Sequence, residues 1–493
     1  MIIKTIVSNG YNANKVVDFV MTESEFYSLT EFACLAGSTV RIVRSNNTSY
    51  VLVKKSNNIH TIDQFVKEAV NRDKGIICFG DSRAANEYYE SPTVTGKYKN
   101  NCGILNWTNA YLYQSLRITY KGVAGNTYAD LVNRYDSDIS PLVASNLYLY
   151  VICSINDVLA NKSSAQIIAD MESLYNRAIE DNLIVIEIAD YHPAVGKELT
   201  AAQRLVFNEV QRYKKIKAKS DNFIVIDSFA LIGNTTSTTP NVPTSKVFDS
   251  SSTGLHINAE SACVIGKKLA TELAKQISVS NQLVSTVTDT KNTTNGGSAS
   301  SSNIVSNSLF IGTAGTRGAS NVLLETTLDS GYTATVASLW NIKINSGGGT
   351  CYTSVGPGID GIGFSQRMRI TGTTAALETY QMSLISAPTS LVTVGKQYIA
   401  RCLVKITACV ALHTVMLRIV NTVSGTVYQY RAMSDKSPQN GNLSPGQYIM
   451  ETPVCDNLSV APSNFEVQVL PIFSAAGGSA TIDISQLECI QLP

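Results

Sequence analysis

The sequence predicts an α/β domain built on a parallel sheet, between a small N-terminal α+β module and a C-terminal all-β jelly roll or sandwich. Three observations predict this division. Apolar runs alternate with amphipathic segments over residues 75–280, a polar segment rich in Gly, Ser and Thr spans 285–308, and only short alternating runs follow it. The predicted domains are therefore 1–60, 61–284 and 309–493, with 285–308 as the linker.

Composition limits the classes of function. The chain has 493 residues, enough for two or three domains, and its 44% hydrophobic content permits sizeable cores. Lys plus Arg number 39 and Asp plus Glu 38, so the net charge of +1 argues against a nucleic-acid groove. No apolar run approaches the ~18 residues of a membrane span. The ten cysteines are scattered without CxxC pairs, so we predict no zinc site.

The first 60 residues predict a small separate module. Residues 23–29 could form a short helix. The segments 38–43 and 48–53 alternate apolar and polar residues around a polar turn, which is typical of a hairpin. Residues 61–72 are then expected to form a linking helix.

The middle of the chain alternates strands and helices. Strands are expected at 76–79, 147–153, 183–188 and 223–226, and helices at 163–181, 199–217 and 259–277. Such alternation implies a parallel sheet covered on both faces, whose ligands bind beyond the carboxyl ends of the strands. Ser82, Asn156 and the pair Tyr191-His192 each follow such an end, so we expect them on one rim.

The last part of the chain has a different pattern. Short alternating runs such as 398–404 and 465–470 are separated by turn residues, without a long helical pattern. The closing run 480–489 is similar to the last strand of many carbohydrate-binding jelly rolls. We therefore expect a carbohydrate-binding-like β domain.

A candidate nucleophile lies directly behind the first strand of the parallel sheet. Gly80-Asp81-Ser82 follows a short apolar run, and a tight turn there exposes a serine hydroxyl at the head of a helix. A serine nucleophile also needs a base and oxyanion donors, and the later residues Gly125, Asn156 and His256 supply them.

These four residues, in this order, resemble the SGNH, or GDSL-like, hydrolase family, which is named for a Ser, a Gly, an Asn and a His. The resemblance covers roughly residues 70–280 and implies a carboxylic ester hydrolase that needs no cofactor. It implies Ser82 as nucleophile and His256 as base. The oxyanion donors would be the Ser82 N–H, the Gly125 N–H, with Gly122 as the alternative, and the Asn156 side chain.

Two positions depart from the family pattern. The third block of the family reads Gly-x-Asn-Asp, but Ser154 replaces its glycine. The last block reads Asp-x-x-His, but Thr253 stands three residues before His256 and the nearest upstream acid is Asp249. Either a longer loop lets Asp249 orient the imidazole, or the site works as a Ser–His dyad.

Other residues have simpler interpretations beside the functional ones. Asp157 is expected to hold the active-site loop rather than to act as the acid. Trp107 and Trp340 are the only tryptophans, and each could either stack on a sugar or pack in a core, the commoner fate.

The start of the sequence lacks the apolar core of a secretion signal. With a leading module and a hydrolase joined to a β domain, the arrangement resembles a bacteriophage tailspike or tail fibre with an SGNH deacetylase. That resemblance implies a homotrimer attached to virion proteins through the N-terminus. It would be made in the host cytoplasm and would act outside the cell on O-acetylated capsule or O-antigen, without nucleic-acid or membrane partners. The alternatives are a non-catalytic glycan-binding receptor-binding protein and a cellular carbohydrate esterase with a binding module.

Overall fold

The structure is a computed structural model. It describes residues 18–22, 39–43, 49–54, 65–68, 75–85, 87–91, 97–101, 103–193, 198–233, 255–277, 279, 283–286, 289–290, 298, 301–384, 388–432 and 443–492. The statements below concern these residues. Asp249 and the predicted helix 23–29 lie outside them.

Four short strands form the described part of the N-terminal module. They are β1 (Asp18–Thr22), β2 (Thr39–Val43), β3 (Ser49–Lys54) and β4 (Phe65–Glu68), in that order in the sheet. The antiparallel pairing of β2 with β3 confirms the predicted hairpin. The predicted linking helix over 61–72 is wrong at 65–68, where β4 pairs with β3 instead. Cross-strand pairing satisfies the backbone groups of this short segment, which is too short for a stable helix of its own.

A five-stranded parallel sheet is the centre of the hydrolase-like domain. Its order is β11 (Phe223–Asp227), β10 (Ile184–Ala189), β9 (Tyr148–Ile152), β5 (Gly75–Gly80) and β8 (Arg117–Gly122). All four predicted strands are confirmed, and all neighbours pair in parallel. The analysis of the sequence missed β8, an edge strand that is only partly buried.

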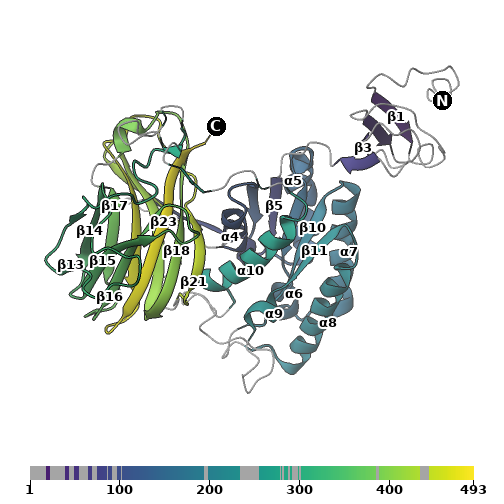
Figure 1. The fold of residues 1–493 in the computed structure, drawn as a ribbon. Coiled ribbons are helices and arrows are strands. Elements are labelled where there is room, and N and C mark those ends of the chain that lie inside the picture. Colours follow the sequence, from purple (N-terminus) through teal and green to yellow (C-terminus); the bar gives the residue numbers. More distant parts are fainter. Residues whose placement is uncertain are drawn as a thin grey trace.

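Helices cover both faces of this sheet, as the alternation predicted. They are α3 (Ser82–Ala85), α4 (Ile104–Tyr111), α5 (Tyr128–Asp138), α6 (Ile155–Leu159), α7 (Ser164–Glu180), α8 (Ala201–Lys217), α9 (Ser228–Ile232) and α10 (Ala259–Leu273), with a 3₁₀ turn at Ser140–Ser145. Ile76 and Cys78 pack toward α4 and α10, whereas Ile77 and Phe79 pack toward α5, α7 and α8. Figure 1 shows α4 and α10 on the side of the sheet that faces the C-terminal strands. None of the helices that the structure describes is long and apolar enough to cross a membrane.

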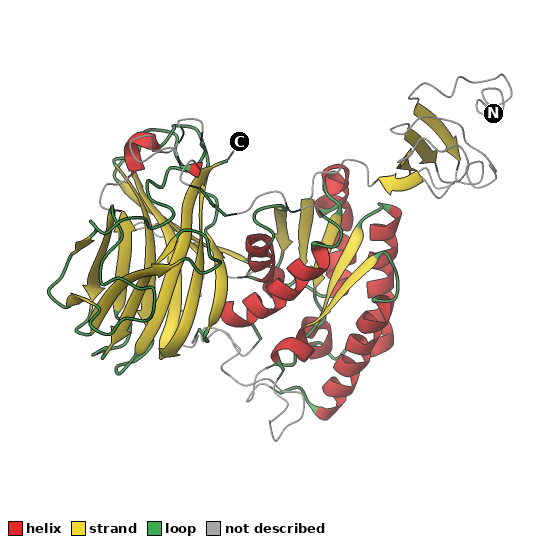
Figure 2. Ribbon diagram, viewed as in Figure 1, coloured by secondary structure: helices red, strands yellow, loops and turns green. Residues whose placement is uncertain are grey.

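The C-terminal part is a sandwich of two sheets (Figure 2). One sheet has the order β12 (Thr316–Arg317), β14 (Trp340–Ser346), β17 (Thr379–Leu384), β22 (Asn464–Phe473), β19 (Leu412–Val423), β20 (Thr426–Ala432), β7 (Lys97–Asn101) and β6 (Tyr88–Ser91). The other has the order β13 (Val322–Leu324), β15 (Thr350–Pro357), β16 (Phe364–Thr371), β23 (Ser479–Gln491), β18 (Tyr398–Val410) and β21 (Gly446–Glu451). A 3₁₀ turn lies at Pro388–Leu391. The predicted all-β sandwich is present, and the jelly-roll topology remains a prediction.

Two strands from the first half of the chain belong to this sandwich. β6 and β7 follow α3 in sequence, yet β7 pairs in parallel with β20. Lys99 on β7 also forms an ion pair with Asp456, with 2.8 Å between Nζ and the carboxylate. The segment directly after the candidate nucleophile is therefore built into the C-terminal sheet.

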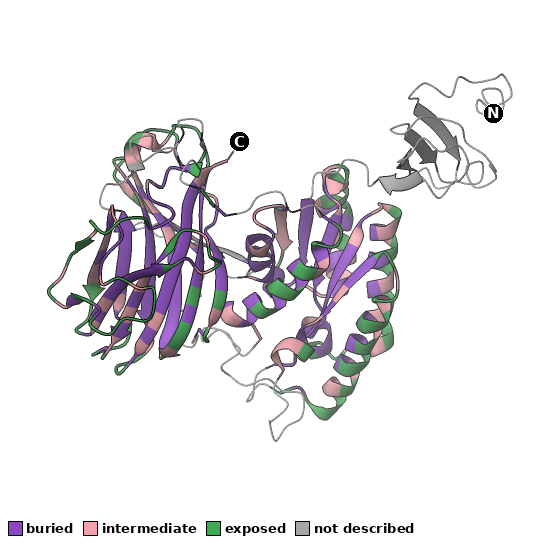
Figure 3. Ribbon diagram, viewed as in Figure 1, coloured by how far each residue is buried: buried purple, intermediate pink, exposed green. Residues whose placement is uncertain are grey.

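One hydrophobic core runs through both units. Residues 104–110 of α4 are all buried, as Figure 3 illustrates, and Trp107 packs beside Tyr448 of β21. Trp107 is 3% exposed and Trp340 is fully buried, so neither serves as a sugar platform. The indole N–H of Trp340 donates to the Asn307 carbonyl inside the sandwich. Both tryptophans therefore have the structural role that we had left open.

Candidate active site

A sharp turn presents Ser82. β5 ends at Gly80, whose φ is +156°, and a Cβ on this residue would lie 2.2 Å from the carbonyl oxygen of Ile152. The Asp81 N–H donates to that same carbonyl at 3.2 Å. Only glycine allows the chain to pass so close to β9. The turn places Ser82 at the first residue of α3, where backbone N–H groups lack intrahelical acceptors.

His256 lies against this serine. Its Nε2 is 2.8 Å from the Ser82 Oγ, although 174 positions separate the two residues. The Tyr191 hydroxyl donates to the carbonyl of Leu255 at 3.2 Å, and Asn258 caps the start of α10. Both sides of the histidine are therefore fixed, one by a residue beyond β10 and one by the following helix. The sequence pointed to Tyr191 only as a rim residue, without this role.

The oxyanion candidates follow neighbouring strands. In the sheet register, Gly80 lies between Gly122 of β8 and Ile152 of β9. Asn156 is in α6, directly beyond β9, and its Nδ2 donates to the Asn126 carbonyl at 2.9 Å. A primary amide has two N–H bonds, so one can remain for an oxyanion.

The two glycine candidates have different surroundings. A Cβ on Gly122 would lie 2.2 Å from the Ala85 nitrogen, so close packing against α3 explains this glycine. Gly125 is exposed, has a φ of +84° and has no atom within 4 Å of a built Cβ. Among the described residues, none accepts a hydrogen bond from its N–H. Packing therefore accounts for Gly122, whereas the role of Gly125 as an oxyanion donor stays a prediction.

The acids near the site already have partners. Asp81 accepts hydrogen bonds from the Arg83 guanidinium, and Asp157 accepts from the Tyr128 N–H at 3.1 Å and from Lys162 at 2.8 Å. Burial raises the pKa of Asp157. This carboxylate holds the first residue of α5, whereas the sequence suggested a hydrogen bond within the active-site loop. The proposed triad acid Asp249 lies outside the described residues, so its role stays a prediction.

A buried ionic network, which we did not predict from the sequence, supports the turn. The Arg83 side chain is 4% exposed and bonds to Asp81 at 2.6 Å and to Asp190 at 2.5 Å. Burial alone would lower the pKa of Arg83, but the carboxylates of Asp190 and Asp81 outweigh it and raise the pKa. Asp190 in turn accepts a hydrogen bond from Ser154 at 3.0 Å. The network ties together the carboxyl ends of β5, β9 and β10.

The contacts of Ser154 explain why a serine stands where the family pattern has a glycine. Its φ is +129° and its ψ is −31°, a conformation that glycine adopts far more easily than serine. Its hydroxyl donates to Asp190 and accepts from the Gln211 side chain at 3.2 Å. Serine therefore occupies a glycine-type position because its side chain joins the buried network.

The histidine beyond β10 is structural. His192 is 4% exposed, and the centre of its ring lies 4.5 Å from that of Phe207. Its Nε2 lies 3.0 Å from the side-chain amide oxygen of Asn208. Burial lowers its pKa. Although His192 follows a strand end, its contacts are those of a packed side chain. Within the described part of the chain, no group of three or more His, Cys, Asp or Glu side chains is arranged to hold a metal ion.

Comparisons with known proteins reach part of the chain. Neither a family model nor a curated protein matches the sequence. A GDSL-like lipase from Bacteroides thetaiotaomicron has 13% identity over 43% of this chain and 93% of its own, with a TM-score of 0.32. The acetylxylan esterase Axe2 from Geobacillus stearothermophilus has 17% identity over 41% and 94%, with a TM-score of 0.32. A member of the lipolytic G-D-S-L family from Veillonella parvula has 19% identity over 41% and 99%, with a TM-score of 0.30. The function is therefore argued from the geometry of the site.

Proposed function

We propose that the chain is a carboxylic ester hydrolase with Ser82 as its nucleophile. The observation that carries this proposal is the distance of 2.8 Å between the Ser82 Oγ and the His256 Nε2. A serine hydroxyl becomes a nucleophile when an adjacent base takes its proton, and this pair has the required geometry.

The proposed mechanism uses only side chains and backbone of this chain. Ser82 Oγ attacks the ester carbonyl while His256 takes the proton and then gives it to the leaving alcohol. The N–H groups of Ser82 and Gly125 and the second N–H of Asn156 stabilise the oxyanion. Water, activated by His256, then releases the acid and restores Ser82. Losing one such donor costs roughly 100- to 1,000-fold in turnover.

The proposed substrate is an O-acetyl ester on a polysaccharide. The support comes from the sandwich, which shares a core with the hydrolase-like domain and takes in β6 and β7 directly after α3. This joint fixes a large second surface relative to Ser82. A polymer can contact both units at once, whereas a small ester contacts the serine site alone.

Acetate release tests the proposal. The wild-type chain should hydrolyse p-nitrophenyl acetate and release acetate from O-acetylated polysaccharide, and the Ser82→Ala chain should do neither while it keeps its circular dichroism spectrum. Equal activity of a folded Ser82→Ala chain would reject the assignment. A wild-type chain that hydrolyses no ester but retains polysaccharide would favour the alternative, a glycan-binding protein on a hydrolase scaffold. The observation that favours this alternative is Thr253, which stands where the family pattern has its acid, three residues before the histidine.

The biological setting belongs to the same proposal. The chain would be a homotrimeric tailspike or tail fibre that attaches to a phage particle through residues 1–60 and acts on capsule or O-antigen. Trimer contacts would cover apolar side chains such as Val410, which is 60% exposed, whereas Leu412 is already buried within the chain. Light scattering decides the assembly, because a particle mass of 53.1 kDa is that of one chain and would reject the trimer. That result would favour a cellular carbohydrate esterase.

A further inference from the structure

A cavity of about 480 Å³ lies where α4 and α10 meet the six-stranded sheet. Figure 1 shows one end of α10 beside β21 at this junction. Its volume lies within the roughly 300–1,000 Å³ of small-molecule sites, which are common between domains. Tyr111 and Tyr113 line it from the end of α4, Gln447 and Gln486 line it from the sheet, and Asp360 lines it from the loop between β15 and β16.

Two of these residues have an uncommon backbone conformation. Tyr113 has a φ of +50° and Gln486 a φ of +48°, although neither is glycine. Such conformations cost free energy and persist only where the surrounding structure holds them. The cavity therefore has fixed walls on both the α4 side and the sheet side.

The polar groups of the cavity suit the hydroxyl edge of a sugar. The Gln447 side-chain amide donates to one Asp360 oxygen at 3.0 Å, which leaves the second carboxylate oxygen and the Gln447 side-chain amide oxygen as acceptors. The Gln486 amide donates to the Val284 carbonyl at 2.8 Å, and its own carbonyl remains as a further acceptor. Planar groups of this kind can each take two neighbouring hydroxyls.

The remaining walls suit the apolar face of a sugar ring. Leu403 and Ile449 line the cavity from the sheet, and Tyr111 lines it from α4. The Tyr111 hydroxyl donates to the backbone carbonyl of Gln447 at 3.3 Å, and the Lys267 Nζ lies 5.5 Å from the centre of the Tyr111 ring. Charge is balanced, because Lys267 and Asp360 are the charged residues that line the cavity. A neutral saccharide fits this balance better than a phosphate or a polycation.

The cavity also lies at a distance from the serine that a polymer can span. Lys267 is eight residues into α10, which is about 12 Å along the helix from the end nearest His256. We propose that this cavity binds a neutral saccharide unit of the same polymer whose ester Ser82 hydrolyses. The link to Ser82 rests on the proposed function, whereas the binding site itself does not.

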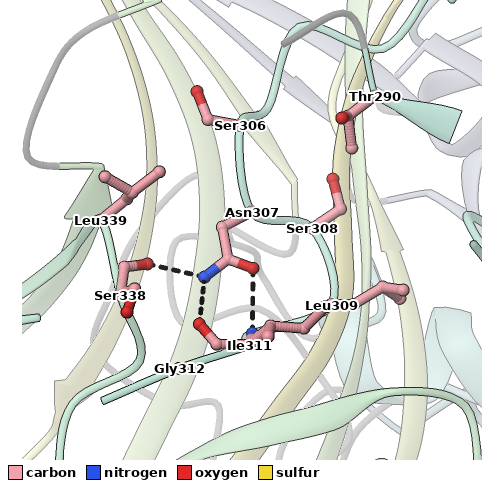
Figure 4. A pocket seen from close by; sticks show the side chains of 9 residues that line it. All are labelled: Thr290, Ser306, Asn307, Ser308, Leu309, Ile311, Gly312, Ser338 and Leu339. Atoms are coloured by element: carbon pink, nitrogen blue, oxygen red, sulfur yellow. Dashed lines mark hydrogen bonds between the residues drawn. The ribbon is translucent and has the colours of Figure 1, made fainter. Parts of the chain in front are cut away.

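A second hollow differs in chemistry. It measures about 310 Å³ and lies in the sandwich beside Ser306 and Leu339 (Figure 4). The Asn307 amide points toward the neighbouring loop, accepts from the Ile311 N–H at 2.9 Å and donates to the Ser338 carbonyl at 2.6 Å. Its central polar side chain is thus used to hold backbone, so we do not assign this hollow a ligand.

Glycan binding by a chain that lacks the Ser82 hydroxyl tests the cavity assignment without hydrolysis of the ligand. The full chain with Ser82→Ala is applied to a printed array of neutral and anionic polysaccharides that includes O-acetylated xylan, and the affinity for each retained glycan is then measured by calorimetry. The test variant adds Asp360→Ala and Gln447→Ala, both exposed residues. The control variant instead adds Asp221→Ala, an exposed aspartate before β11.

We expect retention of at least one neutral glycan, with affinity at least about tenfold weaker in the Asp360/Gln447 variant and unchanged in the Asp221 control. Equal affinity in all three chains, retention of anionic glycans alone, or no retention would each overturn the cavity assignment. Hydrolysis of p-nitrophenyl acetate by the Asp360/Gln447 variant with Ser82 restored should match the wild type. If the wild type hydrolyses no ester, but the Asp360/Gln447 variant still binds the glycan tenfold more weakly than its parent, the proposed reaction fails and the saccharide site stands.

Discussion

Replacing Ser154 separates backbone strain from side-chain bonding. The residue holds φ at +129° and ψ at −31°, and such a conformation costs a non-glycine residue of order 1–3 kcal/mol. Its buried hydroxyl bonds to the Asp190 carboxylate and to the Gln211 amide. A hydrogen bond to a charged group contributes about 1.5–3 kcal/mol, and a neutral one about 0.5–1.5 kcal/mol.

Replacing Ser154 by alanine or by glycine affects the backbone strain and the two hydrogen bonds differently. Ser154→Ala loses both bonds, at about 2–4.5 kcal/mol, and keeps the strain. Ser154→Gly loses the same bonds but releases about 1–3 kcal/mol of strain, less roughly 0.5–1 kcal/mol for the flexibility of glycine in the unfolded chain. The expected order of stability is therefore serine, then glycine, then alanine, with the glycine variant above the alanine variant by up to about 2.5 kcal/mol.

Thermal unfolding of the three chains, followed by circular dichroism, measures this order. At an ordinary position, a glycine variant has a free energy of unfolding roughly 0.5–1 kcal/mol lower than the alanine variant. The order expected at position 154 is therefore the reverse of the usual one. An alanine variant as stable as the glycine variant, or more stable, would refute the argument from strain.

Three further predictions concern the site and its support. Asp249→Ala should lower kcat far less than His256→Ala if Asp249 only orients the base; equal losses would point to a larger role. Tyr191→Phe removes the bond that holds Leu255, so we expect kcat to fall about 2- to 10-fold with KM for p-nitrophenyl acetate unchanged, and an unchanged kcat would contradict this positioning role. Burial raises the pKa of Glu87 from 4.5 to about 7. Between these two pH values the unfolded chain has lost the Glu87 proton, whereas the folded chain keeps it. The free energy of unfolding therefore falls as the pH rises from 4.5 to 7. Glu87→Gln should remove up to about 3 kcal/mol of this fall, which unfolding midpoints at pH 5 and pH 8 would show.

The sequence was most informative about the buried parts of the sheet. The strands β5, β9, β10 and β11 are continuous apolar runs, and three long helices carry amphipathic patterns, so their types followed from periodicity. The edge strand β8 is half polar, and β6 and β7 owe their places to a partner strand more than 300 positions away. No local pattern reports such a partner, and the same reason explains why residues 65–68 form a strand rather than the predicted helix.

The site likewise has some residues that local motifs predicted and others that only the arrangement of the strands brings together. Ser82 and His256 carry motifs, and the structure brings them together. The pair Arg83 and Asp190 could not be predicted, because 107 positions separate them and their contact follows from the order of β5, β9 and β10 in the sheet. One signal was present, since a charged residue directly after a buried nucleophile turn needs a counter-charge, and Asp190 follows a buried strand.

The position of Ser82 in the chain connects these findings. On its N-terminal side the serine is held by β5 in the parallel sheet, and on its C-terminal side the chain runs through α3 into β6 and β7 of the sandwich. The buried Arg83 network fixes the turn itself, and α4 then returns the chain to the shared core. Ser82 therefore lies at the joint between the two units rather than within one of them. Under the proposed function, a polymer that binds the sandwich would be held at a fixed distance from the Ser82 hydroxyl, so that binding would position its ester groups for the reaction.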